Sequence, residues 1–324
     1  MIARRSVLAA GALALGAAIA PAASAAAQAY PSKPIQLFVA FAPGGAGDIV
    51  ARLVTRKMSE RMGQPFVIEN RPSPVVAVLT VAKARPDGHA VVMAGSGTAL
   101  TSALFKRLPY DLMGDFRHVT TLASFDLALV SNDKTGFKTV GDLVAYAKAN
   151  PGKLNIGTVR VGSTQNLTAE MFKSMADIDV TIVPFKTTAD VVTAVRANEV
   201  QAAIEILPPV LSQITAGNVK ALAVTSSRRF AGLPQVPTVA ESGIAGFEAS
   251  SWNGLSVPAK TPPEVVARLA SEVAAAIASP ELQKELQALG MVGESSTPEQ
   301  MTQRMKNDIA KWRGVIEKAG IPLQ

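Results

Sequence analysis

Short apolar runs alternate with amphipathic runs through most of the chain. Eight of the apolar runs predict β-strands, at residues 34–40, 66–69, 90–94, 127–131, 154–158, 180–184, 201–206 and 220–225. Between them, apolar residues recur at helical spacing, as after Asp48 and after Thr164. Strands that alternate with helices favour parallel sheets covered by helices on both faces, which is an α/β fold.

The last quarter of the chain differs, because its pattern predicts helices only. Thr261-Pro-Pro-Glu264 predicts a capping box at one helix start, and Thr139 with Asp142 predicts an earlier one. Ser279-Pro280 and Thr297-Pro298 each place a proline at the first position of a helix. The final helix carries one apolar stripe that predicts core contacts, made of Met301, Met305, Ile309, Trp312 and Ile316.

The first 29 residues predict an export signal rather than part of the fold. Two arginines precede a short apolar stretch, which ends in small residues with Ala-x-Ala sites. We expect cleavage near Ala25 or Ala29 and export of the mature chain. Arg4-Arg5 leaves the twin-arginine route open beside general export. No later stretch approaches the length of a membrane-spanning helix.

Composition narrows the classes of function. The formal charge is +7, and removing Arg4 and Arg5 leaves +5 on the mature chain. The basic residues are spread out and only 5% of residues are aromatic, so we expect no nucleic-acid partner. Cysteine is absent, which excludes thiol nucleophiles, thiolate metal sites and disulfides. A modest positive charge suits anionic solutes.

Four loops follow predicted strands and precede predicted helices. They cover residues 42–47, 95–98, 158–165 and 185–188, and three of them combine small residues with hydroxyls. Ligands of open parallel sheets collect at the carboxyl ends of the strands, where amide groups at helix starts bind anions. A single glycine-rich turn can serve packing alone, but several turns of similar chemistry favour an anion site.

The motifs of nucleotide binding and catalysis are missing. The sequence has no G-x-G-x-x-G after the first strand, no G-x-x-x-x-G-K-[ST], no G-x-S-x-G and no H-E-x-x-H. Its two histidines, His89 and His118, are expected at turns or on the surface rather than as a base or a metal ligand. We therefore expect no enzyme activity, no metal and no cofactor.

The chain resembles the tripartite tricarboxylate transporter substrate-binding proteins, also called the Bug family. The stretches that carry the resemblance are "YPSKPIQLFVAFAPGGAGDIVARLV", "GQPFVIENRP", "PDG", "LPYDLMGDFRHVTTLAS", "ANPGKLNIGT", "VPFKTTADVVTAV", "ALAVTSSRRFAGLPQVPTVAESGIAGFEASSWNGLSVPAKTP" and "IAKWRGVIEKAGI". They span essentially the whole mature chain, and their combination is specific although no single piece is.

The resemblance implies a two-lobed periplasmic binding protein of type II, the Venus-flytrap kind, in which each lobe is a mostly parallel sheet flanked by helices. Residues 30–126 and 253–324 would form lobe 1, and 127–252 would form lobe 2. The chain would cross near 123–127 and 252–254. A small carboxylated solute would sit between the lobes, held mainly by backbone amides and bound waters from the glycine loops.

The ligand-binding residues expected from the loops and the resemblance fall into five groups. They are Phe41, Ala42, Pro43, Gly44, Gly45, Ala46 and Gly47; Ser73; Ser96, Gly97 and Thr98; Arg160, Gly162, Ser163, Thr164 and Gln165; and Phe185, Lys186, Thr187 and Glu205.

Three departures from the family pattern bear on the ligand. The glycine-rich run that usually follows Asn70-Arg71-Pro72 is replaced by "SPVVAVLTVAKARPDG", in which Ser73-Pro74 would cap the next helix. Arg160 stands where relatives mostly have small residues; it either pairs with a ligand carboxylate or faces solvent. Glu205 stands where many relatives have aspartate; it either contacts an amino or hydroxyl group of the ligand or is satisfied within the protein.

The function that these features favour is a monomeric periplasmic receptor that delivers an organic carboxylate to a membrane permease. A sensor subunit that signals to a membrane histidine kinase is the alternative. A secreted hydrolase or isomerase would need a base and a nucleophile converging in the cleft, and the sequence offers no such pair.

Overall fold

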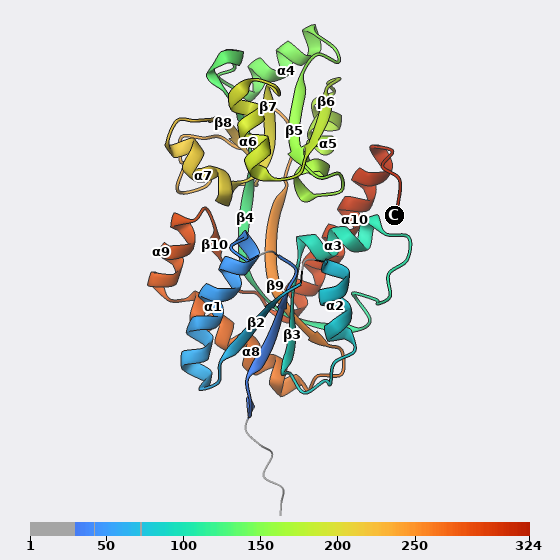
Figure 1. Cartoon of the computed structure of the whole chain (residues 1–324), viewed down its shortest axis with the longest axis vertical. Helices are drawn as coiled ribbons and strands as arrows, with labels where there is room; N and C mark the ends of the chain where they lie inside the picture. Colours follow the sequence, from blue (N-terminus) through green and yellow to red (C-terminus); the bar gives the residue numbers. More distant parts are fainter. Residues whose placement is uncertain (1–29, 42, 72) are drawn as a thin grey trace, which may run out of the picture.

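The computed structural model describes residues 30–41, 43–71 and 73–324. The predicted export signal and Ala42 lie outside these residues. Figure 1 shows a lower and an upper lobe stacked along the long axis and joined by the strands β4 and β9. The strand order runs β2-β1-β3-β9-β4-β7-β5-β6, with β10 and β8 paired to β4.

Each lobe contains three parallel strands. In the lower lobe β1 lies between β2 and β3, and in the upper lobe β5 lies between β6 and β7. Their bounds are Ile35–Val39 (β1), Phe66–Asn70 (β2), Ala90–Gly95 (β3), Asn155–Val159 (β5), Thr181–Phe185 (β6) and Ala202–Ile206 (β7). All six match predicted strands.

Two long strands connect the lobes. β4 (Phe116–Ser131) pairs antiparallel with β9 (Ser250–Pro258) up to Asp126, and from Leu127 onward it pairs with β7 instead. This change of partner lies within the first predicted crossing. The remaining strands, β8 (Lys220–Val224) and β10 (Val292–Gly293), also pair antiparallel with β4. The division of the chain into lobes at single residues stays a prediction.

Helices follow the parallel strands and cover both faces of the sheets (Figure 1). Their bounds are Ala46–Met62 (α1), Pro74–Ala82 (α2), Ser96–Leu104 (α3), Val140–Ala149 (α4), Thr164–Ala176 (α5), Thr188–Ala197 (α6), Leu207–Thr215 (α7), Pro263–Ile277 (α8), Pro280–Ala288 (α9) and Pro298–Lys318 (α10). Within the described residues, no helix is both long and apolar enough to cross a membrane.

The sequence predicted only helices in the last quarter of the chain, and this prediction is wrong. The last quarter also contains β9, which runs between β3 and β4, and the short β10. The stretch "SSWNGLSVP" mixes serine, asparagine and glycine with apolar residues, yet nearly all of it is buried. Both faces of this central strand are covered, so it shows no alternation that would predict a strand.

Two local predictions in lobe 1 are wrong. Thr261 caps no helix: α8 begins at Pro263 with Pro262 at the capping position, and the Thr261 hydroxyl is buried without a hydrogen bond. His118 is no surface residue, because it is only 2% exposed and its Nδ1 lies 2.8 Å from the Ser256 hydroxyl on β9. The predicted starts at Thr139, Ser279 and Thr297 are confirmed as caps of α4, α9 and α10.

One apolar cluster crosses the boundary between the lobes. We call it the shared cluster; it includes Leu100 and Leu104 of α3, Trp312 and Ile316 of α10, and Phe172 and Phe247 of the upper lobe. The Phe172 and Phe247 rings meet edge to face, with centroids 6.1 Å apart. The lower-lobe helices α3 and α10 are therefore packed into the core of the upper lobe.

Candidate ligand-binding site

The loop between β1 and α1 is organised by one buried carboxylate. Asp48 is 2% exposed and lies in the first turn of α1. Its Oδ2 accepts hydrogen bonds of 2.9 Å from the Gly44 amide and from Arg52 Nε, and its Oδ1 accepts one of 2.9 Å from Asn70 Nδ2. Asn70, at the end of the neighbouring strand β2, also donates to the Phe41 carbonyl at 3.0 Å.

These contacts hold Asp48 in its charged form. Burial acts to raise the pKa of the Asp48 carboxyl group, but the hydrogen bonds from Arg52, Gly44 and Asn70 outweigh it and lower the pKa. Asp48 was not among the predicted site residues. An acidic residue in the first turn of a helix, beside an asparagine at the end of the next strand, is the pattern that would have indicated it.

The backbone conformation and the packing of this loop favour glycine at two positions. Gly44 has φ of 78°, the left-handed region that side chains disfavour. A Cβ on Gly47 would overlap the Phe41 ring, which packs directly on it. Gly44 and Pro43 are exposed, while Gly45 and Ala46 are partly so. Helix α1 has Gly45 at its capping position and no side-chain cap, so its first amides face no side-chain acceptor.

The loop between β3 and α3 has similar chemistry. Helix α3 also begins without a side-chain cap on its first amides. The Ser96 hydroxyl accepts from the Trp252 amide of β9 at 3.0 Å, and Thr98 Oγ1 accepts from the Gly95 amide at 2.9 Å. Both hydroxyls are buried in these internal contacts, whereas Gly97 is exposed. Main-chain groups are thus the accessible part of this predicted site.

Ser73 acts as the sequence predicted, as the cap of α2. Its hydroxyl accepts from the Val76 amide at 3.5 Å, with Pro74 at the first helical position. Val76 is 48% exposed, and Val75 is partly buried. The first turn of α2 therefore presents an apolar side chain to solvent.

The loop between β5 and α5 touches the lower lobe. A Cβ on Gly162, which has φ of 74°, would lie 2.7 Å from Leu104 Cδ2 of α3. The Ser163 hydroxyl caps α5 by accepting from the Asn166 amide at 3.1 Å, and the Gly162 amide donates to Asn166 Oδ1 at 3.1 Å. Arg160 is exposed at the edge of this loop.

The loop between β6 and α6 lies beside it. The Arg160 amide donates to the Phe185 carbonyl at 3.1 Å, and the Phe185 side chain is half-buried. Thr187 caps α6 by accepting from the Asp190 amide at 3.2 Å. Lys186 is exposed.

Glu205 joins these upper-lobe loops. It stands near the carboxyl end of β7 and is 0% exposed. Its Oε2 accepts hydrogen bonds from Gln165 Nε2 of α5 at 3.2 Å and from Thr188 Oγ1 of α6 at 2.9 Å. Burial raises the pKa of the Glu205 carboxyl group to about 7, against the hydrogen bonds that lower it.

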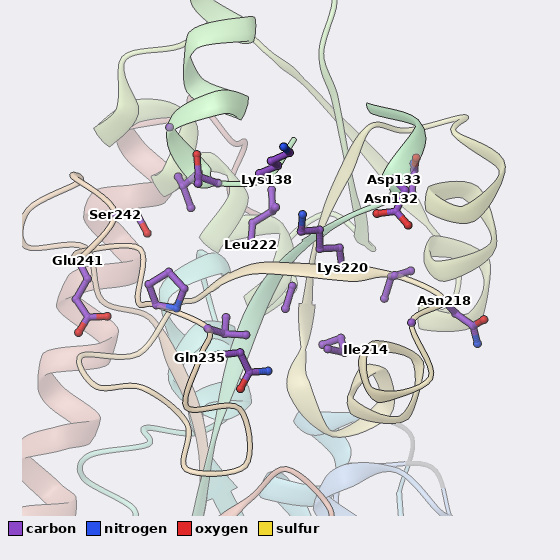
Figure 2. Close-up of a pocket in the computed structure, with 18 residues that line it drawn as sticks. Asn132, Asp133, Lys138, Ile214, Asn218, Lys220, Leu222, Gln235, Glu241 and Ser242 are labelled. Atoms are coloured by element: carbon purple, nitrogen blue, oxygen red, sulfur yellow. The ribbon is translucent and has the colours of Figure 1, made fainter. Parts of the chain in front are cut away.

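The predicted residues therefore lie in both lobes. Asp48 and Asn70 connect the β1–α1 loop to the end of β2. Glu205 connects the starts of α5 and α6. The contact of Gly162 with Leu104 links the two lobes across the boundary. A cavity of about 830 Å³ elsewhere on the upper lobe, between the start of α4, the end of α7 and β8, is lined by none of the predicted residues (Figure 2).

Comparison with known proteins identifies the family. The model of the "Tripartite tricarboxylate transporter family receptor" matches residues 50–321. BugT of Bordetella pertussis is 32% identical over 307 residues, which cover 94% of each chain. A solved R. palustris protein with adipate is 34% identical, with a TM-score of 0.80, over 90% of this chain and 99% of that one.

A second solved protein, MatC from Rhodopseudomonas palustris with bound malate, is 29% identical, with a TM-score of 0.75, over 89% of this chain and 100% of that one. These matches support the two-lobed fold and the receptor function, and they do not favour the sensor alternative. Since the family model covers most of the described chain and relatives match nearly its full length, this protein belongs to the tripartite tricarboxylate transporter receptor family and is a periplasmic solute-binding receptor.

Proposed function

We propose that the protein captures a small organic carboxylate between its lobes, with the ligand carboxylate held by lower-lobe main-chain amides. The observation that carries the proposal is that α1 and α3 both begin without a side-chain cap. Uncapped amides at the positive end of a helix favour an anion. Figure 1 shows the first turn of α1 directed toward the upper lobe and α3 along the boundary between the lobes.

The ligands named for solved relatives support the same chemical class. One relative was solved with adipate and another with malate, and both are small carboxylates. The upper-lobe loops around Gly162, Phe185 and Glu205 would complete the site from the other side. Contacts made only in the closed form would then shift the population of the receptor toward closure.

A thermal-shift screen against carboxylates of four to eight carbons tests this function. A ligand that binds only the native state raises its stability by RT ln(1 + [L]/Kd), about 2.7 kcal/mol at a hundredfold excess over Kd. We expect at least one acid to raise the melting temperature and neutral sugars of similar size to leave it unchanged. A melting temperature raised by sugars and by no acid would overturn the proposal.

The remaining features of the receptor follow from this role. We propose that it is a monomer cut near Ala25 or Ala29, that it passes its ligand to permease subunits, and that it returns the ligand chemically unchanged. The elution volume of the exported protein checks the monomeric state, and its intact mass checks the cleavage site. Mass spectrometry of a ligand after prolonged incubation checks the last, and any turnover product would contradict it.

A further inference from the structure

Glu205 is buried at the boundary of the lobes, and its two carboxyl oxygens are engaged unequally. Burial raises the pKa of its carboxyl group, and the Ile206 and Val159 amides lie close enough to act against this rise, but neither forms a hydrogen bond of normal geometry to Oε1. Oε2 accepts from Gln165 and Thr188, whereas Oε1 has no hydrogen-bond partner among the described residues. The next residue, Ile206, packs against both the shared cluster and the core of the lower lobe. The end of β7 that carries Glu205 therefore faces the other lobe.

An unpaired buried oxygen is costly. A buried polar atom without a partner destabilises the folded state, and a charged one does so more strongly. Gln165 and Thr188 fix the carboxyl group by its other oxygen, so Oε1 is held in one place rather than turned away. A group fixed in this way is suited to receive a donor from a bound molecule.

Among the described residues, no cation is paired with this carboxyl group. The charged side chains nearest to it along the packed elements are Arg160 after β5, Lys186 and Asp190 around the start of α6, and Asp126 on β4. None of them is hydrogen-bonded to Glu205 in the described structure, and Arg160, Lys186 and Asp190 are exposed. The raised pKa of Glu205 is consistent with such isolation.

The two lobes therefore present opposite chemistry. In the lower lobe α1 and α3 offer uncapped amides, which suit a carboxylate. In the upper lobe Ser163 and Thr187 already cap α5 and α6, and a resident carboxylate lies at their first turns. Helix α7 has no side-chain cap, but its first turn contains Pro208 and Pro209, which have no amide hydrogen to donate. A second carboxylate placed beside Glu205 would be repelled by a charge of the same sign.

We propose that Glu205 selects the far end of the ligand: Oε1 accepts a hydrogen bond from a hydroxyl or ammonium group, and a second carboxylate is disfavoured there. This inference rests on the proposed function, because it assumes that a first carboxylate is bound by the lower lobe. It assigns the receptor to hydroxy- or amino-substituted carboxylates rather than to plain diacids.

A matched ligand series tests the inference. The six-carbon acids hexanoate, 6-hydroxyhexanoate, 6-aminohexanoate and adipate share one carboxylate and differ only at the far end, and four-carbon analogues cover a shorter site. Calorimetric titration of the wild type at pH 8 is expected to show the hydroxy or amino acid binding at least tenfold more tightly than the diacid. If the hydroxy acid binds more tightly than the amino acid, the partner of Oε1 is a hydroxyl group. The reverse order indicates an ammonium group.

Glu205→Gln is the informative variant, with Glu199→Gln as its control. Both remove one negative charge, but Glu199 is exposed in the turn after α6. We expect Glu205→Gln to bring the affinities for the donor-bearing acid and the diacid within threefold of each other, and Glu199→Gln to keep the wild-type ratio. An unchanged ratio in Glu205→Gln would overturn the inference.

The wild type alone provides a second measurement, which does not depend on folding of the variant. Lowering the pH from 8 to 6 protonates Glu205, so the diacid is expected to bind more tightly at pH 6 and the hydroxy acid less tightly. A diacid that binds more tightly than the donor-bearing acids at pH 8 would overturn the inference while leaving the proposed function in place. If no acid of either length bound, the carboxylate function itself would be wrong, and this inference with it.

Discussion

At the scale of single residues, two buried carboxylates organise the candidate site in different ways. Asp48 is satisfied on both oxygens and keeps its charge. Glu205 is satisfied on one oxygen, and burial raises its pKa. The sequence predicted the loops that both residues hold, because glycines and hydroxyls mark such turns. It did not predict the Asp48 network, because the partner Asn70 lies 22 residues away and meets Asp48 only when β1 and β2 pair.

Arg160 gives a prediction at the same scale. Its side chain is exposed and forms no ion pair among the described residues. We expect Arg160→Ala to change the free energy of ligand binding by less than about 0.5 kcal/mol, as surface substitutions usually do. Calorimetric titration with the tightest acid of the screen measures this. A loss of tenfold or more in affinity would instead assign Arg160 to direct pairing with a ligand carboxylate.

At the scale of elements, the strands that precede helices were predictable and the connecting strands were not. An apolar run followed by a capped helix predicts both partners, as β5 with α5 and β6 with α6 show. β9 was missed, and β4 was predicted only from residue 127 although it begins at Phe116. Both strands obtain their structure from pairing with each other over long separations. The local pattern of apolar and polar residues carries no information about such long-range pairing.

Helix α10 provides the prediction for this scale. Thr297 accepts from the Gln300 amide at 3.2 Å, and Gln300 Oε1 accepts from the Thr297 amide at 2.9 Å, so the two form a reciprocal cap. We expect Thr297→Ala to lower the free energy of unfolding by about 1 kcal/mol. Urea denaturation measures it, and Thr193→Ala, at an exposed position inside α6, is the comparison. Equal losses in both variants would show that the cap contributes nothing specific.

At the scale of the whole molecule, two buried groups make the stability depend on pH in opposite directions. Burial lowers the pKa of His118 to about 4 and raises the pKa of Glu205 to about 7. Between pH 4.5 and 6.5 the unfolded chain binds the His118 proton and the folded one does not, so stability rises with pH. Over the same window the folded chain holds the Glu205 proton more tightly, so its contribution falls.

Single variants should separate the two contributions. In Glu205→Gln the free energy of unfolding should rise from pH 4.5 to 6.5 more steeply than in the wild type, by up to about 3 kcal/mol. In His118→Asn it should change in the opposite sense by a similar amount. Urea denaturation at four pH values measures both slopes. Parallel profiles in all three proteins would contradict the assigned burial of these groups.

The shared cluster has a consequence for how the protein is made. Trp312 and Ile316 come from the end of the chain, yet they pack with Phe172 and Phe247 of the upper lobe. A nascent chain emerges in sequence order, so the apolar interior around Phe172 and Phe247 lacks the Trp312 and Ile316 side chains until α10 has been made. Until then the upper lobe leaves part of its apolar interior uncovered.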